Sequence, residues 1–344
     1  MSKAVVTIGN FDGVHAGHRA LIARAREIAV SAGGGGGGGA RVIAMAFDPH
    51  PTSRLRPESA PARITRFDRR VELLREAGAD EVVRLEPTDE LLAMTPDEFL
   101  AKLMRDVRPV AVVEGPDFNY GKGRAGSIET LIDEGKRMGF GVEAVHPVEV
   151  ALSDLSIVRA SSTLVRHLVA QGRVRDAMLV LGRAHEIAGV VTKGDQRGRT
   201  IGFPTANIVQ DAEQAVVIPA QGVYAAWARM PDGRKLAAAV NIGARPTFDA
   251  MEPRIEAHLV DVETGKPAAG IPEYGWRLAI EIVGWVRDTV RFSGIDALKA
   301  QLERDREAAL RLLDCGFDAP AADGLVTLKP AAPVAVRATR TMAQ

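Results

Sequence analysis

The sequence predicts two domains of different fold class: an α/β domain with a parallel sheet, then an antiparallel β-barrel or sandwich closed by a helix. From residue 1 to about 150, short apolar runs alternate with amphipathic helical stretches, which is typical of βαβ units. After Gly182, glycine turns separate short β-branched or alternating runs, which is typical of antiparallel sheets. A length of 344 residues also fits two domains better than one.

The individual elements follow from the same patterns. Apolar runs at 4–8, 42–47 and 109–114 predict buried strands, and periodic stretches at 19–29, 68–78 and 97–105 predict helices. Thr95 is the expected N-cap of the last of these helices, with Pro96 at its first position. A helical stretch over 161–181 is interrupted near Gly172. In the second half, strands are expected at 188–192, 222–229, 236–242, 255–262 and 278–286, and a helix at 296–313.

Composition narrows the class of protein. Lys and Arg together number 44, as do Asp and Glu, so the formal net charge is zero. A neutral chain argues against nucleic acid as the main partner, because binding a phosphate backbone draws on many basic residues. Cys315 is the single cysteine, so we expect no intramolecular disulfide and a reducing compartment. With no signal-peptide pattern and no apolar run near the roughly 18 residues of a membrane span, we expect a cytoplasmic protein without a membrane partner.

The most informative segment is Gly-Asn-Phe-Asp-Gly-Val-His-Ala-Gly-His at residues 9–18, between the first expected strand and helix. Glycines let the backbone approach an anion closely, and a helix N-terminus presents unpaired N–H groups to it. His15 and His18 are three residues apart, so both rings can face one phosphate. Fixed donors there would stabilise the charge that develops in adenylyl transfer. The alternative is an ordinary strand-to-helix turn with two surface histidines. The candidate phosphate-binding residues of the turn are Gly9, Phe11, Asp12 and Gly13.

Two further blocks follow buried strands of the first half. Residues 47–51, Phe-Asp-Pro-His-Pro, bring Asp48 and His50 to the end of the second strand. Residues 115–126 bring glycines, a carboxylate, an amide and two cations to the same sheet edge. This second block is not a P-loop, because five residues separate its first two glycines and another glycine follows the lysine.

A third block, at 160–166, opens the helical stretch that ends the first half. Its hydroxyls belong to Ser161, Ser162 and Thr163, and Arg166 lies in the first turn. Hydroxyls at a helix start can act simply as N-caps. They can also donate to phosphate, with the arginine adding charge.

The second half carries a phosphate-binding pattern of its own. Residues 194–202 place three glycines and two arginines directly after a strand: Gly194, Arg197, Gly198, Arg199 and Gly202. In the following Phe-Pro-Thr-Ala-Asn, an extended backbone would put Thr205 and Asn207 on one side. Their oxygens are hard ligands that suit Mg²⁺ bound with phosphates. The alternative is a proline turn with local Asx hydrogen bonds.

The second half also carries an alternating run that contains a carboxylate and a histidine. In the alternating run 254–259, Ile255, Ala257 and Leu259 face one way, whereas Glu256 and His258 face the other. A carboxylate in a barrel strand is costly unless it is paired or functional. Glu256 is therefore expected to be paired or functional, and His258 to be a structural or orienting neighbour.

These blocks, in this order over residues 3 to about 313, resemble the bacterial bifunctional riboflavin kinase/FMN adenylyltransferase family, also called FAD synthetase. The resemblance implies a Rossmann-like HxGH nucleotidyltransferase domain at 1–183, which adenylylates FMN with ATP to give FAD and pyrophosphate. It implies a β-barrel riboflavin kinase domain with a C-terminal helix at 184–315, which phosphorylates riboflavin with ATP. The chain departs from the family in its long tail, which is rich in Ala and Pro and lacks periodicity, so residues 316–344 are expected to be disordered. Mg²⁺ is the implied cofactor, and a homo-oligomer is left open.

The resemblance also implies residue roles. Glu256 would act as base toward riboflavin, and His15 and His18 would serve adenylyl transfer. Thr205 and Asn207 would hold the metal. Flavin contacts are implied for Asp48, His50, Asp117, Phe118, Asn119, Arg124, Arg287 and Phe292. Nucleotide or phosphate contacts are implied for the 9–13 and 161–166 blocks and for the glycines and arginines of 194–202.

Three other functions would account for part of the sequence. One module alone could be active, with the kinase the more doubtful, because Thr192-Lys193 stand where many members carry a hydrophobic residue and a histidine. A class I aminoacyl-tRNA synthetase also carries HxGH, but a KMSKS-like loop is missing and the neutral charge disfavours tRNA. A flavin-binding regulator without turnover would have lost the proposed catalytic side chains. Those side chains are all present.

The run of seven glycines at 33–39 supports a first prediction. Glycines have no side chains to pack, and shortening a flexible connection changes its closure entropy only slightly. Replacing the run with three residues should leave both flavin-converting rates within a few-fold. Loss of FAD formation from a variant that still folds, by circular dichroism, would show a role for the run.

Overall fold

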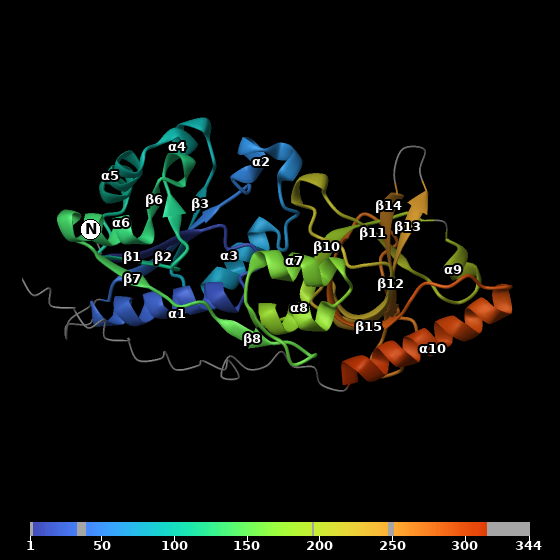
Figure 1. The fold of residues 1–344 in the computed structure, drawn as a ribbon. Helices are drawn as coiled ribbons and strands as arrows, with labels where there is room; N and C mark the ends of the chain where they lie inside the picture. Colours follow the sequence, from blue (N-terminus) through green and yellow to red (C-terminus); the bar gives the residue numbers. More distant parts are fainter. Residues whose placement is uncertain (1–2, 33–38, 195, 247–250, 315–344) are drawn as a thin grey trace, which may run out of the picture.

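A computed structural model describes residues 3–32, 39–194, 196–246 and 251–314. Figure 1 shows a parallel sheet with its helices at one end of the molecule and a barrel at the other. The helices α7 (Ser162–Ala170) and α8 (Val174–Leu181) lie between them in both views. The two predicted fold classes are therefore confirmed, in the predicted order.

The N-terminal sheet has five strands, all parallel, in the order β3-β2-β1-β4-β7. They are β1 (Ala4–Gly9), β2 (Arg41–Phe47), β3 (Glu81–Leu85), β4 (Ala111–Glu114) and β7 (Gly141–Ala144). Strand order reverses at β1, which lies between β2 and β4, and such sheets bind ligands beyond the carboxyl ends of the strands at that point. The strands β3 and β7 were not predicted, because both are short and half-buried and mix charged with apolar residues.

Helices cover both faces of this sheet. One face carries α1 (Ala16–Ser31) and α3 (Phe67–Glu76), and the other carries α5 (Pro96–Asp106) and α6 (Ile128–Met138). The alternation of side chains along β1 explains the two layers, because Val5 packs with the first pair and Val6 with the second. Thr95 caps α5 through a reciprocal bond with Glu98, as predicted.

Short elements complete the N-terminal domain. They are α2 (Thr52–Leu55), η1 (Pro57–Ser59), α4 (Asp89–Ala93), β5 (Asn119–Tyr120), η2 (Lys122–Arg124), β6 (Gly126–Ser127), β8 (Glu149–Ala151) and β9 (Ile157–Arg159). The hairpin of β8 and β9 leads into α7. Most of these elements lie in the loops that follow the sheet strands, where ligands bind.

The C-terminal domain is a closed antiparallel barrel, which decides between the barrel and the sandwich. Its order is β10-β11-β14-β13-β12-β15, with β15 pairing back to β10. The strands are β10 (His185–Thr192), β11 (Ala206–Val209), β12 (Gly222–Arg229), β13 (Lys235–Pro246), β14 (Met251–Val260) and β15 (Arg277–Arg287). The short elements α9 (Arg197–Thr200) and η3 (Ala212–Gln214) lie between strands.

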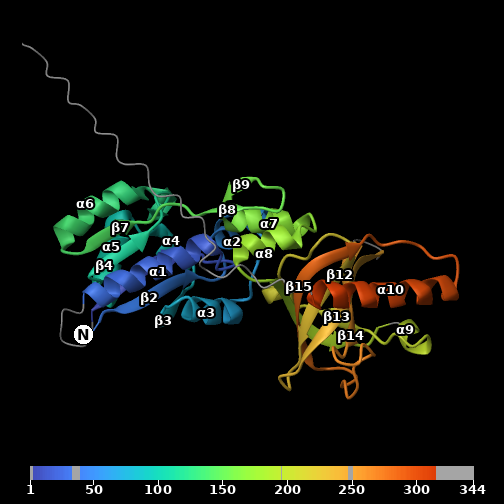
Figure 2. The same cartoon turned by 90° about the horizontal axis from the view of Figure 1, so that it is seen from below.

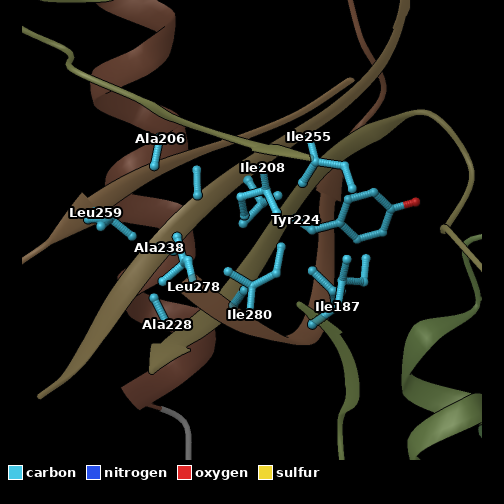
Figure 3. Close-up of a cluster of buried hydrophobic side chains, with 14 of the residues drawn as sticks. Ile187, Ala206, Ile208, Tyr224, Ala228, Ala238, Ile255, Leu259, Leu278 and Ile280 are labelled. Carbon is cyan, nitrogen blue, oxygen red and sulfur yellow. The ribbon is translucent and has the colours of Figure 1, made fainter. Parts of the chain in front are cut away.

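The barrel interior is filled with apolar side chains. Figure 3 shows Ile208, Tyr224, Ile255 and Ile280 from different strands pointing toward one another. The helix α10 (Ile295–Asp314) runs along the outside of the barrel against β12, β13 and β15 (Figure 2). On β14, Glu256 and His258 alternate with the interior residues, so they lie on the outer face of the barrel wall.

The connection between the domains is short. Gly172, with φ 73°, separates α7 from α8, and Gly182, with φ 68°, ends α8. β10 then begins at His185. The predicted domain limit between residues 183 and 184 falls in this connection and stays a prediction. The stretch 33–38, Asp195, Cys315 and the expected tail at 316–344 lie outside the described residues.

Tyr224 provides a test of the barrel core. It is fully buried, and its hydroxyl donates to the Ala220 carbonyl at 2.6 Å. Burial raises the pKa of this phenol to about 12, so it stays a donor at any physiological pH. Tyr224→Phe removes the bond and should lower the free energy of unfolding by about 1 kcal/mol. Urea unfolding followed by fluorescence measures this change, and an unaltered midpoint would contradict it.

Candidate active sites

The HxGH segment forms a tight turn at the carboxyl end of β1. Phe11, Gly13 and Val14 all have positive φ, at 48°, 87° and 40°. A Cβ at Gly13 would lie 3.2 Å from side-chain atoms of Ile64 and Leu181. The positive φ and the close packing both favour glycine there. The chain then enters α1 with His15 as the N-cap residue, so the predicted strand, turn and helix are present.

His15 and His18 lie together at the start of α1. Their rings stack with centroids 3.7 Å apart, and the Nδ1 atom of each is buried with no hydrogen-bond partner in the described part of the chain. Burial, followed by the charges of Arg19 and Arg183, lowers the pKa of His15 to about 3. Burial and His15 likewise hold the pKa of His18 well below its ordinary value. Both rings are therefore neutral at pH 7.

Positive charge surrounds these neutral rings. Besides Arg19 and Arg183, the guanidinium groups of Arg166 and Arg159 act on His15, and that of Arg70 acts on His18. A neutral imidazole with a free ring nitrogen can still donate a hydrogen bond. Neutral donors inside a cluster of arginines fit an anionic ligand such as a polyphosphate.

The 161–166 block lies directly against this turn, although about 150 residues separate the two in the sequence. Ser161 caps α7 by accepting from the backbone N–H of Leu164 at 3.2 Å. The hydroxyl of Ser162 donates to the Asp12 carbonyl at 2.7 Å, and Arg166 forms an ion pair with the Asp12 carboxylate at 2.6 Å. The two blocks thus form one site, and Thr163 is exposed beside them.

Asp12 itself is already saturated by the protein. Its carboxylate accepts from the backbone N–H groups of Ile64, at 3.0 and 3.1 Å, and Thr65, at 3.1 Å, in addition to the Arg166 pair. A buried carboxylate held in this way repels phosphate rather than binding it. Its place is that of an anchor, which differs from the direct phosphate contact that we expected.

A groove lies beside the turn, at the ends of β1, β2 and β4. It has an empty volume of about 1840 Å³. Most of the residues expected to contact flavin line it: His50, Asp117, Phe118, Asn119 and Arg124, together with Gly9. Phe47, Leu91, Phe99 and Tyr120 add apolar surface. The rings of Phe118 and Tyr120 are nearly parallel, with centroids 5.8 Å apart. An apolar groove with flat rings and a few polar groups suits a planar aromatic ligand.

Asp48 does not line the groove, in contrast to the expected flavin contact. It is fully buried and pairs with Arg63, with Arg84 at 2.9 Å and with Arg70 at 3.5 Å. Arg70 in turn donates to the carbonyls of Asn10 and Phe47, at 3.0 and 2.9 Å. Asp48 therefore fixes the arginines that hold the strand ends, one layer behind the groove.

The second site is built on three neighbouring barrel strands. Glu256 on β14 lies opposite Asn207 on β11 and opposite Asn241 on β13, so the three residues form one row. Asn241 donates to the Glu256 carboxylate at 3.3 Å. Arg254 pairs with the other oxygen of Glu256 at 2.9 Å and donates to the side-chain oxygen of Asn207 at 3.3 Å.

Two cavities meet at this row. The larger, with an empty volume of about 1240 Å³, is lined by Glu256, Asn241, Arg287 and Phe292 and by side chains of α10. The smaller, of about 700 Å³, is lined by Gly194, Arg199 and Asn207 and by Tyr274 and Trp276. Thr205 and Gln196 line both cavities. A ligand in the smaller cavity and a ligand in the larger one would therefore meet beside Thr205. Glu256 lines the larger cavity.

Glycines of the 194–202 block allow close packing at this junction. A Cβ at Gly194 would lie 2.2 Å from the side-chain nitrogen of Asn207, and one at Gly198 would lie 2.2 Å from the Phe203 carbonyl. Gly202 has φ 87°. Arg199 pairs with Glu273 at 3.0 Å, and the side chain of Arg197 lies outside the described residues.

Other predicted residues support the larger cavity. The guanidinium of Arg287 lies 5.8 Å from the centre of the Phe292 ring. It also makes a two-pronged ion pair with the buried Asp305 of α10, at 2.7 and 2.6 Å. His258 contacts the Pro204 carbonyl through Nδ1 at 2.8 Å, so it ties β14 to the Phe-Pro-Thr loop.

Several residues around the sites were not predicted. They are Arg19, Arg70, Arg183, Asn241, Arg254 and Asp305. The alternation of β14 already placed Arg254 on the side of Glu256, which was a usable signal. The others reach the sites through cross-strand register or contacts between distant segments, which one sequence does not reveal.

Comparison with known proteins agrees with this arrangement. The FAD synthetase family model matches residues 1–159, and the riboflavin kinase model matches residues 181–313. The bifunctional riboflavin kinase/FMN adenylyltransferase of Escherichia coli K12 is 35% identical over 89% of this chain and 91% of its own length. The chain belongs to this family.

Other relatives show the same extent of similarity. The Bacillus subtilis enzyme of the same name is 31% identical, with 90% of this chain and 92% of the relative covered. A solved structure from Streptococcus pneumoniae, described as a macrolide-efflux protein, has a TM-score of 0.77 and 29% identity over 90% of this chain and 94% of its own. Within the described part of the chain, no helix is both long and apolar enough to cross a bilayer. With both domain models in order, the chain is a bifunctional transferase of this family.

The neutral histidines predict a pH-dependent stability. The folded-state pKa of His15 is about 3, below the ordinary value of 6.5, and the pKa of His18 is lowered in the same direction. The unfolded chain therefore binds more protons below pH 6.5, so the stability is complete above that pH and falls as the pH decreases. Between pH 7 and 5 the loss should be about 2 kcal/mol for His15, with a further loss in the same direction from His18.

Urea unfolding at several pH values measures this dependence. Replacing both His15 and His18 with Ala should make the curve shallower, with the remaining slope due to other buried histidines such as His185, whose pKa burial lowers to about 4. His146→Ala, at an exposed position, should leave the slope unchanged. An equally steep curve in the double variant would contradict the neutral assignment.

Proposed function

We propose that the two reactions of the family are divided between the two sites of this chain. The N-terminal site would join FMN and ATP to give FAD and pyrophosphate, and the barrel site would convert riboflavin and ATP to FMN and ADP. The observation that carries this division is the presence of two separate built sites, one at the HxGH turn and one at the Glu256 row. Each has a place for phosphate and a place for a planar ligand.

In the adenylyl transfer, a phosphate oxygen of FMN attacks the α-phosphorus of ATP. A new P–O bond forms, the bond between the α-phosphorus and its bridging oxygen breaks, and pyrophosphate leaves. We assign His15 and His18 as neutral donors to the oxygens on which charge develops. The N-terminus of α1 and the surrounding arginines add positive potential. The groove beside Phe118 holds the flavin.

In the phosphorylation of riboflavin, the terminal hydroxyl of the ribityl chain attacks the γ-phosphorus of ATP. We assign Glu256 as the group that accepts the hydroxyl proton while ADP leaves. Asn241 holds one oxygen of this carboxylate, and the other faces Arg254. The cavity with Arg287 and Phe292 would take the flavin, and the cavity with Tyr274 and Trp276 would take the nucleotide.

The residues present fit Mg²⁺ in the kinase site. Thr205 lines both cavities and Asn207 lines the smaller one, where Asn207 is packed against Gly194, so that a Cβ at Gly194 would clash with it. Within the described residues, no group of three or more His, Cys, Asp or Glu side chains could form a cage. Such a sparse site suits Mg²⁺, which keeps several waters and shares substrate phosphates. When bound, the ion would neutralise charge on the transferring phosphoryl group.

We extend the proposal to partners and compartment. Riboflavin, FMN and ATP are the proposed substrates, with no nucleic-acid partner, because the net charge is zero. A cytoplasmic location agrees with the single cysteine.

Separate variants test the division of labour. Glu256→Gln keeps the size of the side chain and one acceptor oxygen but removes the base, so FMN formation should fall roughly 10²-fold or more. FAD formation from supplied FMN should remain. Replacing His15 and His18 with Ala should do the reverse: FMN accumulates and FAD is nearly absent, with roughly 2–4 kcal/mol lost for a donor of this kind. The measurement is chromatographic separation of riboflavin, FMN and FAD over time.

Matched controls are the exposed residues Glu263→Gln and His146→Ala, which should leave both reactions unchanged. If either test variant remains folded by circular dichroism and loses both activities, one reaction per site is the wrong assignment.

A further inference from the structure

The turn that carries the HxGH motif has a costly backbone conformation. Val14 has φ 40°, and Phe11 has φ 48°, a region that bulky or β-branched side chains rarely adopt. Such conformations persist only where the surrounding structure holds them. His15 is the next residue along the chain, so the geometry of this turn decides where its ring stands.

Arg183 makes several of the hydrogen bonds that keep the turn in this conformation. Its guanidinium donates to the Gly13 carbonyl at 2.7 Å and to the Val14 carbonyl at 3.4 Å. Further bonds reach the hydroxyl of Thr65 at 3.4 Å and the carbonyl of Leu181 at 3.3 Å. One side chain is therefore hydrogen-bonded both to two successive carbonyls of the strained turn and to the last residue of α8.

Arg183 is the last residue of the first predicted domain, yet it lies within the range 181–313 that the riboflavin kinase model matches. It lies in the short connection between α8 and β10, where the riboflavin kinase domain begins. Arg19 of α1 reaches the same connection and donates to the Leu181 carbonyl. The junction is thus tied to the turn from one side and to the first helix from the other.

A second path runs from the barrel to the same turn. The backbone N–H of Val217 donates to the Arg63 carbonyl at 2.7 Å, and the side chain of Gln214 accepts from the Phe67 N–H at 3.5 Å. The segment between Arg63 and Phe67 supplies the two backbone N–H groups that hold Asp12. The barrel therefore supports, through one intervening segment, the carboxylate that organises the turn.

We propose that Arg183 is a positioning residue for adenylyl transfer, and that the docked riboflavin kinase domain completes the FMN adenylyltransferase site. The inference rests on the proposed division of reactions between the two sites. Arg183 lines neither cavity of the barrel site, so the kinase reaction should not depend on it. The dependence would run in one direction, from the kinase domain to the adenylyltransferase.

Arg183 also contributes charge at the histidines. The charged groups that act on His15 are Arg19 from α1, Arg166 from α7, Arg159 from β9 and Arg183 itself. All are cations, and each lowers the pKa of His15. Removing one of them should raise that pKa, and a merely structural support would not have this effect.

The experiment uses the full chain with Arg183→Gln, Arg183→Lys and the exposed control Arg137→Gln. FAD formation from FMN and FMN formation from riboflavin are measured separately. In Arg183→Gln, kcat/KM for FAD formation should fall about 10²-fold, because misplacing a reacting group by about 1 Å costs that much. FMN formation and the thermal midpoint of the barrel should match the wild type. Arg183→Lys, which keeps the charge and one donor, should recover most of the loss.

The pH profile of kcat/KM for FAD formation provides the second readout. Its acid limb should move to higher pH in Arg183→Gln and stay in place in Arg183→Lys, because only the first variant loses the charge. Unchanged FAD formation in Arg183→Gln would overturn the role of Arg183. A loss without any shift of the limb and without rescue by lysine would also overturn it, in favour of simple destabilisation. Impaired FMN formation with intact FAD formation would overturn the division of reactions itself.

Discussion

The buried carboxylate of Asp12 is the contact on which the N-terminal site depends. It joins three segments that are distant in the sequence: the turn after β1, the segment around Ile64 and the first turn of α7 through Arg166. Removing one partner of such a buried pair typically costs about 3–5 kcal/mol, because the other charge is left without compensation. The site proposed to bind phosphate is thus organised around an internal carboxylate, with arginines gathered near it.

The same use of internal charge recurs behind the groove. Asp48 forms ion pairs with Arg63, Arg70 and Arg84. Arg70, held in this way, donates hydrogen bonds to backbone carbonyls at the ends of β1 and β2. Neither carboxylate faces the space where a ligand would lie. Acidic residues in a phosphate-binding motif can therefore act by fixing arginines and backbone N–H groups, which carry the positive potential.

In the barrel, the controlling constraint is strand register. Burial of Ile255, Ala257 and Leu259 in the interior puts Glu256 on the outer face, under α10. A slip of one residue would exchange the two faces and move the carboxylate into the apolar core. Register also places Asn207 and Asn241 on either side of Glu256, so the residues proposed as metal ligand, base and orienting amide come from three strands in one row.

Periodicity, glycine turns and motif order were enough to predict the parallel α/β domain and the antiparallel domain, and they named the candidate residues that the structure gathers around two groups of cavities. These features are local, since alternation, caps and turn residues act within a few positions of the chain. The short strands β3 and β7 were not predicted, because half-buried edge strands have only a weak pattern of apolar residues. The closure of the barrel, the row around Glu256 and the enclosure of Asp12 and Asp48 by arginines arose from contacts across many residues. Such contacts depend on which surfaces pack together in the folded chain, and one amino-acid sequence does not specify that packing in a form that local patterns reveal. For the same reason Arg183, an ordinary junction residue in the sequence, became a support of the HxGH turn only once the two domains were docked.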